Sequence, residues 1–327
     1  MSAPLLEVTN LRAWLELRRG TVKAVDGISF TLREGETLGI VGESGSGKTM
    51  TALSLLRLLP KPAGRIVEGS SIRLDGTELL DLDEAGMQSW RGSRISMVSQ
   101  DPQSSLNPVF SIGDQVAAPI REHTKGLTRN AIRQASIDVL RRLSIPAPEE
   151  RLGNYPHQFS GGMRQRVVAA MAIACSPRLL IADEPTSNLD VTIQVQIMEL
   201  FREIQRETKV GIILVTHDLG VAAGICHQIA VMYAGRLVEI GDVRTIFRAP
   251  RHPYTKALLN TVPRLGESRK RLFAIEGQPP SLMNLPRGCR FAARCPDRMP
   301  KCDIASPPDF EREPGHKVAC WLESKDT

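Results

Sequence analysis

A glycine-rich run early in the chain has the residue types and spacing of a phosphate-binding loop. The segment GESGSGKT follows a short apolar run and precedes a helix-forming one. Its glycines leave room for backbone N–H groups to converge on phosphate oxygens, and a helix beginning near Lys48 points its positive end at them. Lys48 is expected to reach the β- and γ-phosphates, and the Thr49 hydroxyl to coordinate Mg²⁺. The residues predicted to bind the nucleotide here are Gly42, Glu43, Ser44, Gly45, Ser46, Gly47, Lys48, Thr49 and Met50.

Two adjacent carboxylates end a second apolar run. In LLIADEP, four apolar residues precede Asp183 and Glu184. Such acids commonly cap a following helix, but beside a phosphate-binding loop they indicate metal and water chemistry. Asp183 is expected to bind Mg²⁺, and Glu184 to polarise the water that attacks the γ-phosphate.

A third candidate lies in FSGGM, where two glycines follow Ser160 and a helix-forming run comes next. This order is typical of a helix N-terminus that can bind an anion. Alone, such a turn is usually a simple cap. Its position 23 residues before Asp183 makes it a functional candidate.

Short β-branched runs, separated by helical stretches, would position these residues. The runs are 28–32, 37–41, 94–99, 179–183, 212–216 and 229–233. Their alternation with helices predicts an α/β core with a largely parallel sheet. The first two runs are close enough in sequence to form an antiparallel element. Apolar residues at helical spacing over 127–143 predict a helical insertion between 100 and 161.

Composition bounds the function classes. The chain has 327 residues, of which 42% are apolar and 24% charged, as in ordinary globular proteins. No apolar run approaches the roughly 20 residues of a membrane span, and no secretory signal is readable, so we expect a cytosolic protein. A net charge of +6 allows anionic partners. Aromatic residues are only 4% and no long basic run occurs, so nucleic acid is not an expected partner.

Four of the six cysteines cluster in a Pro- and Gly-rich region after about residue 248. They are Cys289, Cys295, Cys302 and Cys320, separated by five, six and seventeen residues. Four thiolates suit either zinc or an iron–sulfur cluster, and the spacing alone leaves the metal open. His316 could replace one ligand, and four unliganded thiols are the alternative. Cys175 and Cys226 are interpreted as small buried hydrophobes.

Six motifs in order give the chain, from residue 5 to 248, a resemblance to ABC transporter ATPases. GESGSGKT resembles the Walker A motif, FSGGM the signature, LLIADE Walker B, MVSQDP the Q-loop, SNLD the D-loop, and LVTHD the switch histidine. The resemblance implies a P-loop NTPase fold, with a RecA-like core, an antiparallel β subdomain and a helical subdomain at about 101–165. Met163 and Asn188 depart from the usual signature Gln and D-loop Ala.

The resemblance also implies roles and a dimer. Gln100 would contact Mg²⁺ and the attacking water, and His217 the γ-phosphate; with Glu184 these form the catalytic set. Ser160, Gly161 and Gly162 would approach ATP held by a second ABC ATPase chain, and Asp190 would cross that interface. Trp14 is the candidate for adenine stacking, although a Trp after a short strand more often packs.

QDPQSSLNPVFSIGDQ, HPYTKALLNTVP and PPSLMNLPRGCRFAARCP resemble the oligopeptide and dipeptide importer branch of that family. This resemblance implies an ATPase domain over 1–250 and a C-terminal extension over 251–327, and it favours a four-iron four-sulfur (4Fe–4S) cluster over zinc. It implies two permease subunits, an extracytoplasmic binding protein, and a peripheral place on the cytoplasmic face of the cell membrane.

The expected function is therefore ATP hydrolysis that powers peptide uptake. Uptake of nickel, glutathione or sugar is an alternative substrate assignment. A soluble ABC-type ATPase acting on nucleic acid or ribosomes is the rival from another class. Such proteins usually carry paired cassettes or long insertions, whereas this chain has one phosphate-binding loop.

Overall fold

The structure, a computed structural model, describes residues 3–187, 190–261 and 274–324. The chain divides into two compact units, which are described separately. The helical unit consists mainly of Leu80–Leu214, with Arg33–Glu36. The sheet unit consists of Pro4–Leu32, Thr37–Leu79 and Val215–Thr327. The domain boundaries inferred from the sequence stay predictions.

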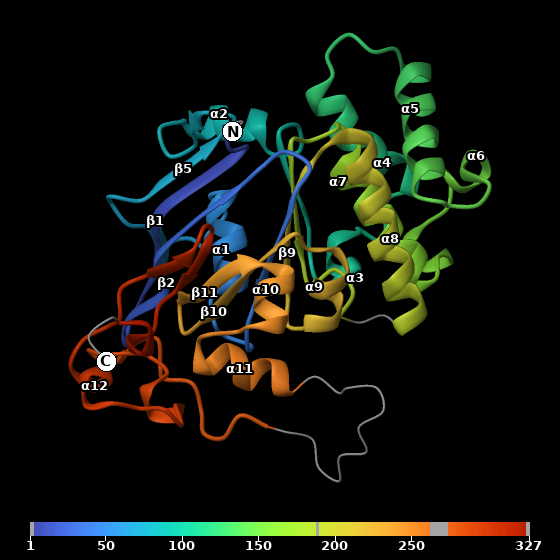
Figure 1. Ribbon diagram of the computed structural model, residues 1–327. Coiled ribbons are helices and arrows are strands. Elements are labelled where there is room, and N and C mark those ends of the chain that lie inside the picture. The colour runs from blue at the N-terminus through green and yellow to red at the C-terminus, as the bar shows by residue number, and fades with distance from the viewer. Residues whose placement is uncertain (1–2, 188–189, 262–273, 325–327) are drawn as a thin grey trace. The chain divides into compact units, whose positions relative to one another are not determined.

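The sheet unit begins with an antiparallel sheet in the order β2-β1-β5-β6, with β4 paired to β1. Along its two long strands buried and exposed residues alternate in several stretches, which is the pattern of a sheet with one covered face. Figure 1 shows the two long strands in blue. The strands are β1 (Leu6–Leu17), β2 (Gly20–Leu32), β4 (Gly64–Ile66), β5 (Ser71–Leu74) and β6 (Thr77–Glu78).

A second group of strands in this unit runs β12-β13-β11-β10-β3. All five residues of β3 are buried, and β3 pairs with β10 in parallel. The predicted antiparallel pairing of 28–32 with 37–41 is therefore wrong: β2 pairs with β1, because its half-covered pattern suits a different sheet from the fully buried β3. The strands are β3 (Thr37–Val41), β10 (Gln228–Tyr233), β11 (Arg236–Asp242), β12 (Phe310–Glu313) and β13 (His316–Val318).

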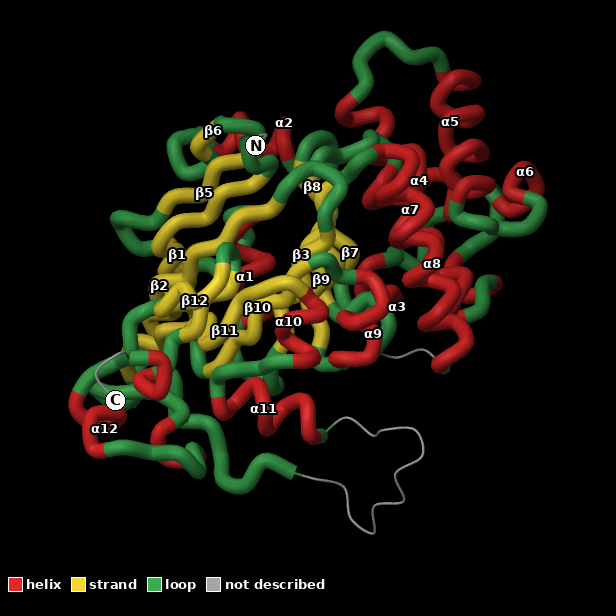
Figure 2. The backbone as a smooth tube through the Cα atoms, viewed as in Figure 1, coloured by secondary structure: helices red, strands yellow, loops and turns green. Residues whose placement is uncertain are grey.

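Helices of the sheet unit are short, and its described part after residue 273 is mostly loop, as the green segments of Figure 2 show. The helices are α1 (Lys48–Leu55), α9 (Leu219–Ile225), α10 (Val243–Arg248), α11 (Pro253–Asn260), α12 (Pro300–Ile304) and the 3₁₀ turns η2 (Ala292–Arg294) and η3 (Trp321–Glu323). Because this region has little regular secondary structure, side-chain contacts hold it in place.

The helical unit combines parallel strands with the expected helical insertion. β7 (Ile95–Val98) pairs in parallel with β8 (Leu179–Asp183), and β9 (Gly211–Thr216) starts beside β8 within this unit. Helix α5 matches the predicted 127–143 closely, and Thr128 caps it by accepting from the Ala131 N–H. Helices α4, α5 and α7 pack together. The helices are α2 (Glu84–Trp90), α3 (Pro102–Ser105), α4 (Ile112–His123), α5 (Arg129–Arg142), α6 (Pro148–Arg151), η1 (Pro156–Gln158), α7 (Gly161–Ile173) and α8 (Val191–Thr208).

Candidate functional site

The phosphate loop, residues 42–49, joins β3 to α1 and is shaped by glycines. Gly47 has φ of 109°, a conformation that L side chains rarely adopt, and helix α1 begins at the next residue. A Cβ at Gly42 would lie 2.1 Å from the Met232 carbonyl oxygen, and a Cβ at Gly47 would lie 2.2 Å from that of Ala24. The turn can therefore approach its neighbours this closely only with glycine at both positions.

Lys48 is nearly buried at the start of α1, and its ammonium group turns back onto the loop. Its Nζ donates to the carbonyl oxygens of Gly42, at 2.9 Å, and Glu43, at 3.0 Å. The Ser46 hydroxyl is buried and has no hydrogen-bond partner among the described residues. A cation and a buried hydroxyl at a helix N-terminus suit an anionic ligand, so the loop fits the phosphates of a nucleotide.

The other loop residues that were predicted to bind the nucleotide lie along the same turn. Glu43 directs its carboxylate to Arg294, and Gly45 has φ of 75° in open space. Ser44 precedes Gly45, and Thr49 and Met50 occupy the first turn of α1.

In the helical unit, the structure brings two predicted catalytic residues together. The Gln100 amide donates from Nε2 to Oε2 of Glu184 at 3.1 Å. Asp183, the last residue of β8, is 3% exposed, and Glu184 follows it with φ of 45°. The abrupt backbone turn after β8 gives the two carboxylates different surroundings.

Two helix N-termini of the helical unit carry predicted interface residues. Ser160 caps α7, its Oγ accepting from the Met163 N–H at 3.3 Å. Asp190 caps α8, its Oδ1 accepting from the Ile193 N–H at 3.0 Å. Both caps are exposed, and Gly161 and Gly162 form the first turn of α7. Asn188 of the D-loop lies outside the described residues.

His217 belongs to the sheet unit, where it directly follows β9 and is exposed. The neighbouring Asp218 caps α9 through its Oδ1, which accepts from the N–H groups of Gly220 and Val221. The histidine therefore lies between a buried strand and a capped helix.

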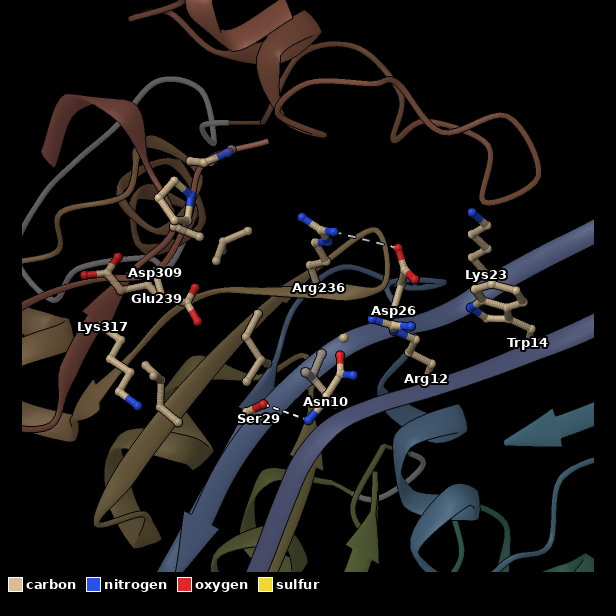
Figure 3. A pocket seen from close by; sticks show the side chains of 18 residues that line it. Asn10, Arg12, Trp14, Lys23, Asp26, Ser29, Arg236, Glu239, Asp309 and Lys317 are labelled. Carbon is tan, nitrogen blue, oxygen red and sulfur yellow. Dashed lines mark hydrogen bonds and ion pairs between the residues drawn. The ribbon is translucent and has the colours of Figure 1, made fainter. Parts of the chain in front are cut away.

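Trp14 lines a cavity of about 480 Å³ in the sheet unit (Figure 3). The cavity lies among β1, β2, β11 and residues 307–309, and no phosphate-loop residue lines it, although all of them are described. Lys23 Nζ lies 4.9 Å and Arg65 Cζ 5.4 Å from the indole centroid. Cations therefore already contact the indole, and adenine stacking by Trp14 stays a prediction.

Comparison with known proteins places this site in a family. The model described as ABC transporter matches residues 25–187, and the one described as oligopeptide/dipeptide transporter, C-terminal region, matches residues 238–302. The dipeptide transport ATP-binding protein DppD of Bacillus subtilis is 50% identical over 98% of this chain and 95% of its own length. The oligopeptide transport ATP-binding protein OppD of Salmonella typhimurium is 49% identical over 97% of this chain and 93% of its own.

The chain belongs to the ABC transporter family.

Within this family it groups with the ATP-binding proteins of dipeptide and oligopeptide transport, and it is an ATPase of that type. Among solved structures, the ATP-binding cassette MJ0796 in a dimeric post-hydrolysis state bound to ADP and Pi has a TM-score of 0.65 and 25% identity, over 73% of this chain and 99% of that one. The P-loop NTPase fold inferred from the resemblance is thereby confirmed. None of the helices in the described part of this ABC protein has both the length and the apolar character to span a bilayer.

The iron–sulfur cluster expected from Cys289, Cys295, Cys302 and Cys320 is wrong for this ABC protein. Residues 274–324 are described throughout, yet no group of three or more His, Cys, Asp or Glu side chains among the described residues is arranged to hold a metal ion. The zinc alternative lacks a site in the same residues for the same reason. The names of the relatives record ATP binding and peptide transport.

The four cysteine side chains are half-buried or buried. Burial raises the pKa of Cys289, raises that of Cys295 to about 11, and raises that of Cys320 to about 12. Cys302 is buried, and its carbonyl oxygen accepts from the Cys289 N–H at 2.7 Å. These four cysteines form no disulfide with one another.

Two residues that hold the phosphate loop escaped the sequence analysis. Tyr254 and Arg294 contact Glu43 from positions 211 and 251 residues away in sequence. HPYTKALL, which contains Tyr254, served only as a family marker, and FAARCP drew attention to its cysteine rather than its arginine. No periodicity or spacing signal links either residue to the loop.

Proposed function

We propose that this chain hydrolyses ATP to drive the uptake of di- or oligopeptides across the cell membrane. The observation that carries the proposal is the near full-length similarity, at 50% identity, to a dipeptide transport ATP-binding protein, together with an intact phosphate loop. The pairing of Gln100 with Glu184 supports a hydrolytic rather than a merely binding role.

The reaction is transfer of the γ-phosphoryl group to water. Lys48 and the N-terminus of α1 bind the phosphates, and Glu184 accepts the proton of the attacking water as its oxygen bonds to phosphorus and the bond to ADP breaks. The Gln100 amide, which donates to Glu184, orients that carboxylate. His217 contacts the γ-phosphate.

Mg²⁺ fits the oxygen-rich donor set that we assign to it: the Thr49 hydroxyl, the Gln100 amide oxygen and the Asp183 carboxylate. When bound, the ion neutralises charge on the phosphate oxygens. Asp183 is nearly buried, as suits a carboxylate with a fixed partner rather than a solvated one.

The assembly that we propose has two ABC ATPase chains, the second either another copy or a related one. The exposed N-terminus of α7, with Ser160, Gly161 and Gly162, is assigned to the ATP of the second chain, and Asp190 to the interface. The dimeric state named for MJ0796 supports this arrangement. Two permease subunits and an extracytoplasmic binding protein complete the importer, with this chain on the cytoplasmic face of the membrane.

Glu184→Gln in the assembled transporter tests the hydrolytic role. Glutamine keeps the size and the hydrogen bond of the side chain but cannot accept a proton. We expect ATP binding to persist and turnover to fall by at least about 100-fold. Turnover at the wild-type rate would remove Glu184 from this role. Accumulation of labelled peptide in cells that carry the transporter, compared with labelled sugar or nickel, tests the substrate class.

A further inference from the structure

The C-terminal extension (residues 251–327) contacts the phosphate loop at Glu43. Arg294, from η2, makes two parallel contacts with this carboxylate: Nη1 to Oε2 at 2.8 Å and Nη2 to Oε1 at 3.0 Å. Such bidentate pairs fix orientation as well as charge. The Arg294 side chain is only 5% exposed and that of Glu43 is 24% exposed, so water screens this pair less than a surface one.

The backbone of Glu43 is held at the same time. Its N–H donates to the hydroxyl oxygen of Tyr254, on α11, at 3.0 Å. Its carbonyl oxygen accepts from Lys48 Nζ at 3.0 Å and from the Ser46 N–H at 3.2 Å. The extension thus supplies two of the contacts that hold Glu43 in place. The carbonyl oxygen of Glu43 is one of the two that accept from the Lys48 ammonium group.

Arg294 is itself locked in place by the sheet unit. Its Nε donates to the Glu276 carbonyl at 2.9 Å, its Nη2 to the Ile275 carbonyl at 3.1 Å, and its Nη1 to the Tyr233 hydroxyl at 3.3 Å. The hydrogen bond with Glu43 is the main reason why the pKa of Arg294 lies above its usual range, which keeps the guanidinium charged. An arginine with this many partners is preorganised to hold the carboxylate in one place.

A carboxylate in a phosphate-binding loop raises an electrostatic problem. ATP brings several negative charges, and like charges a few ångströms apart repel strongly where water is partly excluded. Pairing with Arg294 neutralises Glu43 and turns its carboxylate toward the extension. We propose that Arg294 is a positioning residue of the nucleotide site, through which the C-terminal extension sets the affinity of the loop for ATP.

This inference rests on the proposed ATP binding. It assigns Arg294 a role in the affinity for ATP, whereas a purely structural ion pair would affect only the stability of the protein. If Arg294 only ties the extension down, its loss lowers the stability of the protein but leaves the Kd of the folded chain for ATP unchanged. If Arg294 neutralises and orients Glu43, its loss raises that Kd, and removing the carboxylate relieves most of the defect. The two readings therefore differ in whether the Kd of the folded chain changes and recovers.

The experiment measures the Kd of a fluorescent ATP analogue with Mg²⁺ on the purified full-length chain. We expect Arg294→Ala to raise Kd by roughly tenfold or more, within the usual range of coupling between sites. The double variant Arg294→Ala with Glu43→Gln should return to within about threefold of Glu43→Gln alone. Arg294→Lys, which keeps the charge but not the two-point contact, should lie between.

Arg298→Ala is the matched control, because Arg298 lies in the same extension and pairs with Asp303 at the surface, 2.9 Å away. Its Kd should equal that of the wild type. Thermal unfolding of each variant identifies any that is not folded at the assay temperature. Wild-type affinity in Arg294→Ala, or a double variant as weak as Arg294→Ala, overturns the inference. A wild-type chain that does not bind the analogue would instead overturn the proposed function.

Discussion

The phosphate loop of the sheet unit and the helix N-termini of the helical unit are built in opposite ways. In the phosphate loop, Lys48 and Ser46 are buried. Glu43 of the same loop contacts Tyr254 and Arg294, which lie far from it in the sequence. Ser160 and Asp190 are exposed, and each caps the helix that follows it. The loop is held by residues distant in sequence, whereas each cap joins residues three positions apart.

This difference matches the division of labour proposed for the two regions. A loop held from several sides is preorganised, so a single chain can bind nucleotide without first ordering the loop. Exposed, capped helix N-termini keep their positive ends available to a ligand brought by another molecule. Binding should therefore depend on residues around the loop, and turnover in the assembled transporter should depend in addition on α7 and α8.

The largest effect is expected from crowding the loop itself. In Gly47→Ala the new methyl group would meet the Ala24 carbonyl at 2.2 Å, in a backbone conformation with φ of 109°. We expect the Kd for ATP to rise by at least about 100-fold. The clash with the carbonyl oxygen and the strained backbone conformation both displace the loop, which a side-chain adjustment alone cannot relieve. Equilibrium titration of the folded variant with an ATP analogue measures this.

Gly45→Ala is its control within the same loop. Gly45 also has a positive φ, of 75°, but a Cβ there meets nothing within 4 Å. Only the backbone strain of about 1–2 kcal/mol applies, so the loss of affinity should be about 30-fold at most. Equal losses in the two variants would show that conformation, rather than close packing, governs the loop.

Local signals in the sequence were enough to predict the parts of the site that lie on single elements. The bounds of β3 and β8 match the predicted runs 37–41 and 179–183, because fully buried parallel strands are short, unbroken apolar runs. Helix α7 starts directly after Ser160, where a serine and two glycines precede a helix-forming run. Helix capping and strand burial depend on residues that are neighbours in sequence, so both can be predicted without knowledge of the tertiary structure.

Tertiary contacts set the limit of the sequence analysis. The contact of Arg294 with Glu43 depends on how a loop-rich extension packs, which no spacing rule encodes. The four clustered cysteines showed the opposite failure, since their spacing allowed a metal site, whereas no group of potential ligands among the described residues is arranged to hold a metal ion. Along β1 the buried Leu11 and Ala13 lie on one face of the strand, so the alternation places Trp14 on the other face.

A smaller effect, and on turnover alone, is expected from Gly162→Ala at the start of α7. A Cβ at this position would approach Cγ2 of Ile193, in the first turn of α8, to 2.9 Å. The two helix N-termini would separate slightly, which should lower ATPase turnover of the assembled transporter by about tenfold while ATP binding by the chain is unchanged.

Gly153→Ala is the comparison for this variant, because Gly153 belongs to the same unit and a Cβ there meets nothing within 4 Å. It should leave turnover at the wild-type level. A loss of ATP binding in Gly162→Ala would contradict the separation of roles between the two regions.

The smallest effect concerns pH and the support of the loop. His252 caps α11, the helix of Tyr254, and its Nδ1 accepts from the Tyr254 N–H at 3.0 Å. Burial lowers the pKa of His252 to about 3, whereas an unfolded histidine has a pKa near 6.5. Between these values the unfolded chain binds the extra proton, so stability is complete above about pH 6.5 and falls as the pH drops toward 3.

His252→Asn keeps a side-chain acceptor at the helix cap but does not titrate. We expect the wild type to lose up to about 1.4 kcal/mol of unfolding free energy per pH unit below 6.5 relative to this variant. Urea unfolding of both proteins at pH 7 and pH 5 measures the difference, which should shrink or reverse in acid. A difference that is the same at both pH values would assign the acid sensitivity to other groups. Because α11 carries the hydroxyl that holds Glu43, acid should weaken the phosphate loop before it affects the self-capped helices α7 and α8.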